Sequence, residues 1–482
     1  TQTGLCGTTS QIVIDTAMCL RSFVTYVDKT DYSVAKLPPK APDMISYNVN
    51  NATSHLDASQ LQNVINTQLL GEGGDPFNHF ERFKVRDPVI NRPIAVNPAG
   101  FVHCGDGHFG AVNYSETDSP GIAMAFASRA MAKRPFEVES TLANDLRKFG
   151  ESFLDPMIEA TDVSQLAEPE DLPQFYREAN HGKKTRAQID KACTLYERFE
   201  GNALSVRQRE LYESASAFVK GEMNTKEVEQ EDDELPDSRP KPRLILMMSA
   251  LLSMVLCPVT MLIEAWNHGP FNKFQVKGLD HSSMVERIIA ASCKEQYNVS
   301  DYQAFESSIR GVLKEFEFYV MLRLCERAGF HRTADALRTL FRGGRRVMTR
   351  WGTFFIFSRC SGDYWTSFGN GIVNVVVMAY CAHCNNLGKP MMRNGELTLE
   401  DDRDFDMLAE GDDGLVNSMV PNLKVIADLG LYFKLSLVGH KPGDCDFLQS
   451  LWEDGDRYLN IGRVVSSIFV IFKAAELKTT KQ

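Results

Sequence analysis

Three acidic residues in the second half of the 482-residue chain lie at the ends of short apolar runs. Asp412 and Asp413 stand between two such runs (LAEGDDGLV), and the flanking glycines predict a β-hairpin with both acids at its tip. Asp301 ends the run YNVSD, which predicts a second short strand, followed by a helix that begins near Ser307. Taken alone, Gly-Asp-Asp is equally typical of a surface turn, so the second strand is what makes the hairpin chemically interesting.

Neighbouring strands that end in Asp301 and in Asp412-Asp413 would hold three carboxylates within a few ångströms of each other. Like charges at that distance need divalent cations to offset their repulsion. Two cations about 3.5–4 Å apart can stabilise the attacking and leaving oxygens of an in-line phosphoryl displacement. We therefore expect Asp301, Asp412 and Asp413 to be metal ligands, and nucleotidyl transfer or nuclease cleavage to be the chemistry.

A polar loop lies between the two carboxylate strands in the sequence (SGDYWTSFGN). A β-like run leads into it and a long apolar helix leads out of it. Gly362 lets the loop flex or approach a ligand closely. Ser361, Thr366 and Asn370 are short hydrogen-bonding residues, and the last two are four apart on one helix face. An ordinary helix N-cap explains one such residue, but not three.

The order D-x4-E, S-G-x3-T-x3-N and G-D-D resembles motifs A, B and C of viral RNA-dependent RNA polymerases. The wording of the segments SRPKPRLI, DYQAFES, SGDYWTSFGN and EGDDGLV is closest to the tombusvirus-like and weivirus-like positive-strand RNA viruses. The resemblance covers about residues 217–452. Jointly these motifs are specific, whereas each alone is not.

The resemblance implies roles for further basic residues. Residues 218–222 and 241–245 look like the two arms of motif F, with Arg243 over the incoming triphosphate and Lys220 and Lys241 beside it. Lys434 matches the motif D lysine that protonates the leaving pyrophosphate, although a lone lysine after a helix is often simply exposed. Residues 445–450 resemble motif E, the hairpin against which a primer end rests.

The resemblance also implies a nucleotide pocket built by Glu306, Ser361, Gly362, Thr366 and Asn370. Glu306 departs from the family, which usually has Asp at this position. The family uses this acid, together with motif B, to sense the ribose 2′-OH. We therefore expect Asn370 to face Glu306, with Ser361 completing a polar network around that hydroxyl.

The fold implied is α/β (α+β), a right-hand polymerase with fingers, palm and a short or incomplete thumb. Strands are expected near 297–301, 353–358, 405–410 and 414–420, and helices over 308–329, 364–384 and 421–430. Motif G is placed at Thr117–Gly121. The expected divisions are an N-terminal extension (1–80), fingers including motif F (81–290), palm with motif A (291–330), a fingers insertion (331–352), palm with motifs B to E (353–452) and a partial thumb (453–482).

Charge and cysteine content narrow the function classes. The net charge of -11 excludes a globally basic nucleic-acid coat, so any RNA-binding groups must be gathered locally. Residues 331–350 carry six Arg, and this suits an RNA backbone or, alternatively, a solvated helix face. Eleven irregularly spaced Cys predict reduced thiols, and Cys381 and Cys384 with His383 are read as buried thiols and not as a zinc site.

One apolar segment has the length of a membrane span. Leu244–Ile263 contains twenty residues without a charge. Its Pro258, its scattered Ser and Thr, and the basic motif directly before it favour a buried helix between domains. A direct membrane span is therefore not expected.

These features together predict a viral RNA-directed RNA polymerase that replicates and transcribes the viral genome by two-metal nucleotidyl transfer. The expected cofactor is Mg²⁺, with Mn²⁺ as a substitute, and the expected partners are the RNA template, the product strand, NTPs and other viral replicase or capsid proteins, but not DNA. The expected location is the host cytoplasm, in a replication complex or virion. Two alternatives stay open: a reverse transcriptase or DNA polymerase, and a catalytically idle, polymerase-like structural or membrane-organising component of a viral replication complex.

Overall fold

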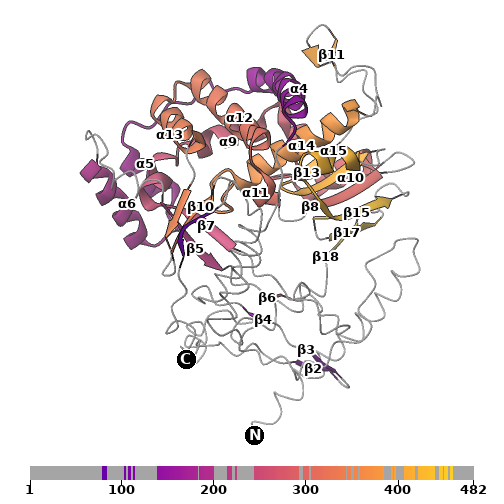
Figure 1. The fold of residues 1–482 in the computed structure, drawn as a ribbon, viewed down its shortest axis with the longest axis horizontal. Coiled ribbons are helices and arrows are strands. Elements are labelled where there is room, and N and C mark those ends of the chain that lie inside the picture. The colour runs from indigo at the N-terminus through magenta and orange to yellow at the C-terminus, as the bar shows by residue number, and fades with distance from the viewer. Residues whose placement is uncertain are drawn as a thin grey trace.

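The computed structural model shows a chain of mixed helices and strands (Figure 1). It describes the longer segments 138–182, 184–199, 244–292, 305–342, 359–384, 407–417 and 422–439. It also describes the shorter segments 79–83, 102–104, 107–109, 112–113, 214–219, 223–224, 297–302, 345–348, 352–356, 392–393, 396–397, 445–448, 450–453 and 456–459.

A four-stranded antiparallel sheet forms the centre of the candidate site. Its order is β13-β14-β8-β15, from Met407–Glu410, Asp413–Asn417, Tyr297–Tyr302 and Phe433–Gly439. Strands β13 and β14 are joined by a two-residue turn that begins at Gly411, where φ is +66°. A glycine is favoured there because L side chains rarely adopt positive φ. The predicted strands at 297–301, 405–410 and 414–420 are confirmed, with shifts of a few residues at their ends.

Alternating residues of this sheet enter two separate hydrophobic cores. On one face, Met407 and Ala409 join a large core that includes helices α12 (Val312–Ala328) and α14 (Thr366–Cys384). On the other face, Leu408 packs with α10 (His281–Ala291) and the strands that follow residue 445. In Figure 1, α14 lies between α12 and the strands of the sheet. The sheet is thus covered on both faces. The acids lie at the end of the sheet where β13 turns into β14.

A second, five-stranded sheet lies on the other side of the polar loop. Its order is β1-β10-β9-β5-β7. The strands are His79–Phe83, Gly352–Ile356, Arg345–Met348, Ser214–Val219 and Leu244–Met248. The edge strand β7 also pairs with the loop, through a bridge between Met247 and Gly362. The strand expected at 353–358 is confirmed as β10.

The remaining elements surround these two sheets. The helices are α4 (Ser140–Ala160), α5 (Leu172–Ala179), α6 (Arg186–Phe199), α8 (Ala250–Val255), α9 (Val259–His268), η5 (Pro270–Phe274), α11 (Phe305–Ser308), α13 (His331–Arg342) and α15 (Leu423–Asp428). The short strands are β2 (Val102–Cys104), β3 (Gly107–Phe109), β4 (Val112–Asn113), β6 (Met223–Asn224), β11 (Met392–Arg393), β12 (Glu396–Leu397), β16 (Cys445–Phe447), β17 (Ser450–Glu453) and β18 (Asp456–Leu459).

The uncharged segment Leu244–Ile263 is not one helix, so that expectation is corrected. Its first five residues are β7, whose side chains alternate between buried and partly buried and which pairs with β5. Ser249 then caps α8, and the chain turns at Leu256–Pro258 before α9. Within the residues described, no helix is long and apolar enough to cross a membrane.

Three of the six arginines of residues 331–350 are paired with carboxylates of the protein, Arg350 lies outside the described residues, and RNA binding by this segment stays a prediction. The Arg332 Nε atom lies 3.9 Å from Glu168 Oε1, and the Arg338 Nη2 atom lies 3.2 Å from Glu326 Oε1. Arg345 is buried and forms an ion pair with Asp363. These three arginines therefore fasten elements of the protein to each other.

Candidate active site

The sheet brings two of the predicted acids directly opposite each other. Asp413 of β14 is the register partner of Asp301 of β8. Opposed residues of antiparallel strands have Cα atoms roughly 4.5–5.5 Å apart and point to the same face. Asp412 occupies the turn next to them, and all three side chains are partly exposed. The expected neighbourhood of these strand ends is therefore confirmed.

Helix α14 contacts the turn between β13 and β14 through Asn374. The Asn374 Nδ2 group lies 3.3 Å from the Gly411 carbonyl, 3.4 Å from that of Asp412 and 3.2 Å from that of Asp413. Asn374 is completely buried. The two hydrogens of this amide can bond to two of the three carbonyls at a time, which fastens the turn to α14. Sequence reasoning missed this residue, although its position four residues after Asn370 places both on one face of α14.

The polar loop is docked onto strand β7. The Ser361 hydroxyl donates to the Leu244 carbonyl at 2.9 Å, and the Gly362 N–H donates to the Leu246 carbonyl at 3.1 Å. A Cβ on Gly362 would lie 2.5 Å from that same carbonyl, so this close approach requires glycine. The Ser361 hydroxyl is therefore engaged with β7, and its expected part in a network around a sugar hydroxyl stays a prediction.

Thr366 and Asp363 fix the end of the loop where α14 begins. The Thr366 hydroxyl lies 2.9 Å from the Asp363 carbonyl and 3.2 Å from the Cys360 carbonyl. The Asp363 carboxylate binds the Arg345 guanidinium through both oxygens. Burial raises the pKa of Asp363, while Arg345 opposes that rise by favouring the charged form. The loop is thus tied to β7 at one end and to β9 at the other.

Asn370 meets an arginine that the sequence did not single out. The Arg359 guanidinium donates to the Asn370 Oδ1 atom, and it also donates to the Thr366 carbonyl at 3.0 Å. Glu306 acts on the same guanidinium electrostatically, favouring its charged form. Asn370 is thus in contact with Arg359, and its expected position facing Glu306 across a nucleotide pocket stays a prediction.

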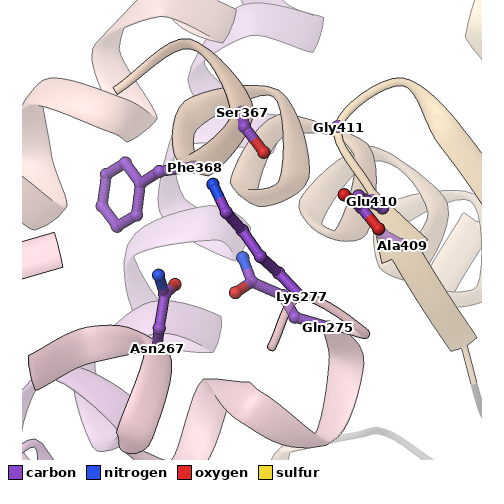
Figure 2. Close-up of a pocket in the computed structure, with 8 residues that line it drawn as sticks. All are labelled: Asn267, Gln275, Lys277, Ser367, Phe368, Ala409, Glu410 and Gly411. Carbon is purple, nitrogen blue, oxygen red and sulfur yellow. The ribbon is translucent and has the colours of Figure 1, made fainter. Parts of the chain in front are cut away.

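A small pocket with polar lining residues, open to solvent, lies on the β13 side of the turn (Figure 2). Lys277 reaches into it toward Ser367, and Glu410 lies across from them. Lys277 is the one cation among its eight lining residues. Gln275, 6% exposed, also lines it. The remaining lining residues are Asn267, Phe368, Ala409 and Gly411. Sequence reasoning missed this pocket because its walls come from distant segments.

The predicted basic residues are only partly placed. Lys220, Lys241 and Arg243 lie outside the described residues, as does the segment Thr117–Gly121. Lys434 lies on β15, where the register with β8 shifts between Phe433 and Leu435. Since Leu435 is the partner of Asp301, the backbone of Lys434 is at the same end of the sheet as the acids.

The donor chemistry of the acids fits a divalent metal, although the described side chains do not form a complete set of metal ligands. Among the described residues, no group of three or more His, Cys, Asp or Glu side chains is arranged to hold an ion. Carboxylate oxygens on neighbouring strands are nevertheless the donors that Mg²⁺ prefers. At the former zinc candidate, Cys381 is buried, and burial raises the pKa of its thiol to about 12, whereas Cys384 is exposed.

The chain was compared with known protein families and with curated proteins. No protein-family model matches it, and no curated protein matches its sequence. Function is therefore inferred from the residues and from their geometry.

Proposed function

We propose that the protein is a viral RNA-directed RNA polymerase, which joins nucleotides on an RNA template by attack of a 3′-OH on the α-phosphate of an NTP. The pairing of Asp301 with Asp413, with Asp412 in the adjoining turn, is the observation that carries this proposal. It sets carboxylates from two separate segments at one end of one sheet, which is what two-metal phosphoryl chemistry requires.

The architecture supports a right-hand arrangement. The sheet β13-β14-β8-β15, with α12 and α14 on one face and α10 on the other, would be the palm. The five-stranded sheet and the helices from α4 to α9 would belong to the fingers, and the residues after 453 to a short or incomplete thumb. Strands β8, β14 and β15, which carry the segments that resemble motifs A, C and D, pair side by side although they are distant in sequence, and this supports the proposal.

Asp301 and Asp412 would hold two Mg²⁺ ions, with Asp413 assisting and Mn²⁺ as a substitute. When bound, such ions stabilise charge on the attacking and leaving oxygens. The chain's own contribution is rigidity: the Asn374 amide and the β8–β14 ladder hold the acids in place before any ligand arrives. Preorganised groups avoid the cost of rearranging during the reaction.

The incoming nucleotide would lie between the acids and the polar loop. Glu306 and Asn370 would face the sugar, and Thr366 would fix the start of the helix that carries Asn370. Lys220, Lys241 and Arg243 would contact the triphosphate. Because Leu244 follows Arg243 directly and accepts a hydrogen bond from Ser361, docking of the loop would keep the sugar and triphosphate sites together, with Gly362 permitting the contact.

The Lys434 side chain would donate a proton to the leaving pyrophosphate. The backbone of Lys434 lies beside Asp301, which supports this role. Lys277 would meet a phosphate of the RNA strand, because it is an exposed cation beside the catalytic turn. Template, product strand, NTPs and other viral replicase or capsid proteins would be the partners. The setting would be a replication complex or virion in the host cytoplasm.

A primer-extension assay on an RNA template with Mg²⁺ tests the proposal. The parent chain should add NTPs, whereas Asp412→Asn should add none and still bind RNA, because most RNA affinity comes from phosphate contacts. Elongation by Asp412→Asn within about tenfold of the parent would contradict the assignment. Preference for dNTPs would favour a reverse transcriptase, and a parent that adds nothing would favour the idle structural component.

A further inference from the structure

Arg359 is a fully buried cation placed directly beside Asn370. Its side chain has no exposed surface, and it forms an ion pair with the equally buried Glu317 of α12. The same guanidinium donates to Asn370 Oδ1 and to the Thr366 carbonyl. Arg359 therefore joins a carboxylate of α12 to the first turn of α14.

The surroundings keep this guanidinium charged despite its burial. Burial lowers the pKa of Arg359 to about 10, and the carboxylates of Asp363 and Glu306 oppose that effect. Among the described residues, neither Glu317 oxygen has a hydrogen-bond partner of regular geometry, so charge holds this pair together. A buried charge that loses its partner is costly. Glu317 thus needs Arg359 in place.

Gly369 gives the ion pair its space. A Cβ on Gly369 would lie 2.4 Å from a Glu317 oxygen and 2.6 Å from an Arg359 nitrogen. The helix therefore lacks a side chain at the point where the guanidinium passes, and the guanidinium can reach the neighbouring Asn370. This close fit leaves Arg359 few positions other than the one observed.

The contact decides which way the Asn370 amide faces. Its Oδ1 atom accepts from Arg359, a group that can only donate. The Nδ2 group, a donor, stays available for another acceptor, because Arg359 can pair only with the oxygen of the amide. Asn370 also lies beside the catalytic turn, since a Cβ on Gly411 would be 3.9 Å from the Asn370 Cβ.

We propose that Arg359 is a positioning residue for sugar selection: it fixes the Asn370 amide so that Nδ2 is presented to the ribose 2′-oxygen of the incoming nucleotide. This inference rests on the proposed polymerase function. A site built to donate to a hydroxyl rejects the analogue that lacks it, since its own polar group then stays unpaired. The contact between Arg359 and Asn370 therefore sets the preference of the enzyme for NTPs over dNTPs.

The test is the ratio of kcat/KM for ATP to that for 2′-dATP, measured with the full chain. Asn370→Asp keeps the shape and the contact with Arg359 but replaces the donor by an acceptor. It should lower the ratio by about tenfold or more, with an unchanged melting temperature. Arg359→Lys keeps the charge opposite Glu317 but loses the fixed fork, and should lower the ratio by about threefold to tenfold.

Arg345→Lys is the matched control, because Arg345 is also a buried arginine and is paired with Asp363 of the polar loop. It should slow both substrates equally and keep the ratio. A ratio within about twofold of the parent in Arg359→Lys or in Asn370→Asp, or an equal loss of both rates with an unchanged melting temperature, would overturn the inference. A parent chain that adds no nucleotide would instead overturn the proposed function, so the two failures are distinct.

Discussion

Asp413 lies between two other acids in the central sheet: it is the register partner of Asp301 on β8 and, on its other side, of Glu410 on β13. Residues opposed in this way point to the same face of a sheet. Three carboxylates therefore form a row across three strands at the turn end. Like charges placed directly opposite destabilise a sheet, so this row is a cost that a bound cation would offset.

Asn374→Ala should loosen the turn between β13 and β14, at Gly411 and Asp412. The substitution removes the amide that lies within hydrogen-bonding distance of three successive carbonyls, and with it up to two hydrogen bonds to the turn. We expect the free energy of unfolding to fall by about 1–3 kcal/mol. Nucleotide addition should slow while RNA affinity stays. Urea unfolding and primer extension measure the two effects.

Asn144→Ala is the control for Asn374→Ala, because Asn144 is exposed on α4 and makes one hydrogen bond to Arg147. It should change neither quantity. Equal stability of Asn374→Ala and the parent would show that the three carbonyls find other donors, and would contradict the role of Asn374 in holding the turn.

Gly362→Ala should separate the polar loop from β7. The new methyl group would meet the Leu246 carbonyl at 2.5 Å, and a backbone atom cannot move aside as a flexible side chain can. We expect a loss of about 1–3 kcal/mol in the free energy of unfolding, as in other overpacked sites. The apparent KM for NTP should rise, since loop and triphosphate site are coupled.

Gly278→Ala provides the comparison for the loop. Gly278 has a φ of +82°, and a Cβ there meets nothing within 4 Å. It should cost only the roughly 1–2 kcal/mol of left-handed backbone strain and leave KM unchanged. If the two glycine variants raise KM alike, docking of the loop does not control the nucleotide site.

Lys314 should make stability depend on pH. Burial, together with the nearby Arg345, lowers the pKa of Lys314 to about 8 from its ordinary value of 10.5. The unfolded chain therefore binds more protons than the folded chain between pH 8 and 10.5, and stability should rise as pH rises through that window. Below pH 8 Lys314 is charged in both the folded and the unfolded chain, and its burial lowers the free energy of unfolding by the full amount.

Lys314→Met should accordingly stabilise the protein at pH 7 by about 1–3 kcal/mol, and this gain should shrink as the pH approaches 10. Urea unfolding across this pH range measures it. Lys148→Met, at an exposed position of α4, controls for the loss of a charge. A gain that does not depend on pH would contradict the role given to Lys314.

Lys277→Ala should weaken RNA binding evenly across sequences. A lysine that meets one phosphate contributes about 0.7–0.9 to the slope of log affinity against log salt concentration. Anisotropy titrations of a labelled RNA at several salt concentrations should therefore show a shallower slope. Lys191→Ala, on the exposed surface of α6, should keep the parent slope. An unchanged slope in Lys277→Ala would place the RNA elsewhere.

Local patterns predicted the elements of the site well. The alternation of apolar residues around Asp412 and Asp413 indicated the hairpin, and the long apolar run after Thr366 indicated α14. These features depend on residues near in sequence, so sequence alone reveals them. The segment beginning at Leu244 was misread because its apolar composition suits a strand or a helix equally.

Contacts between distant segments could not be predicted in the same way. Arg359 is a single basic residue in its stretch, and nothing near it in the sequence indicates that Glu317 neutralises it inside the core. The hydrogen bond from the Ser361 hydroxyl to the backbone of β7 is likewise a contact that the residue type alone does not indicate. Both outcomes depend on how α12, α14 and β7 pack together.

The most direct test of the catalytic centre is the rate of single-nucleotide addition to an RNA primer in Mg²⁺, compared between Asp301→Asn and Glu410→Gln. Each variant neutralises one register partner of Asp413, on opposite sides of it. We predict that Asp301→Asn loses at least about a thousandfold in rate, equivalent to some 4 kcal/mol of barrier, and that Glu410→Gln stays within about tenfold of the parent. Addition by Asp301→Asn within about tenfold of the parent, or an equal loss in both variants, would contradict the assignment.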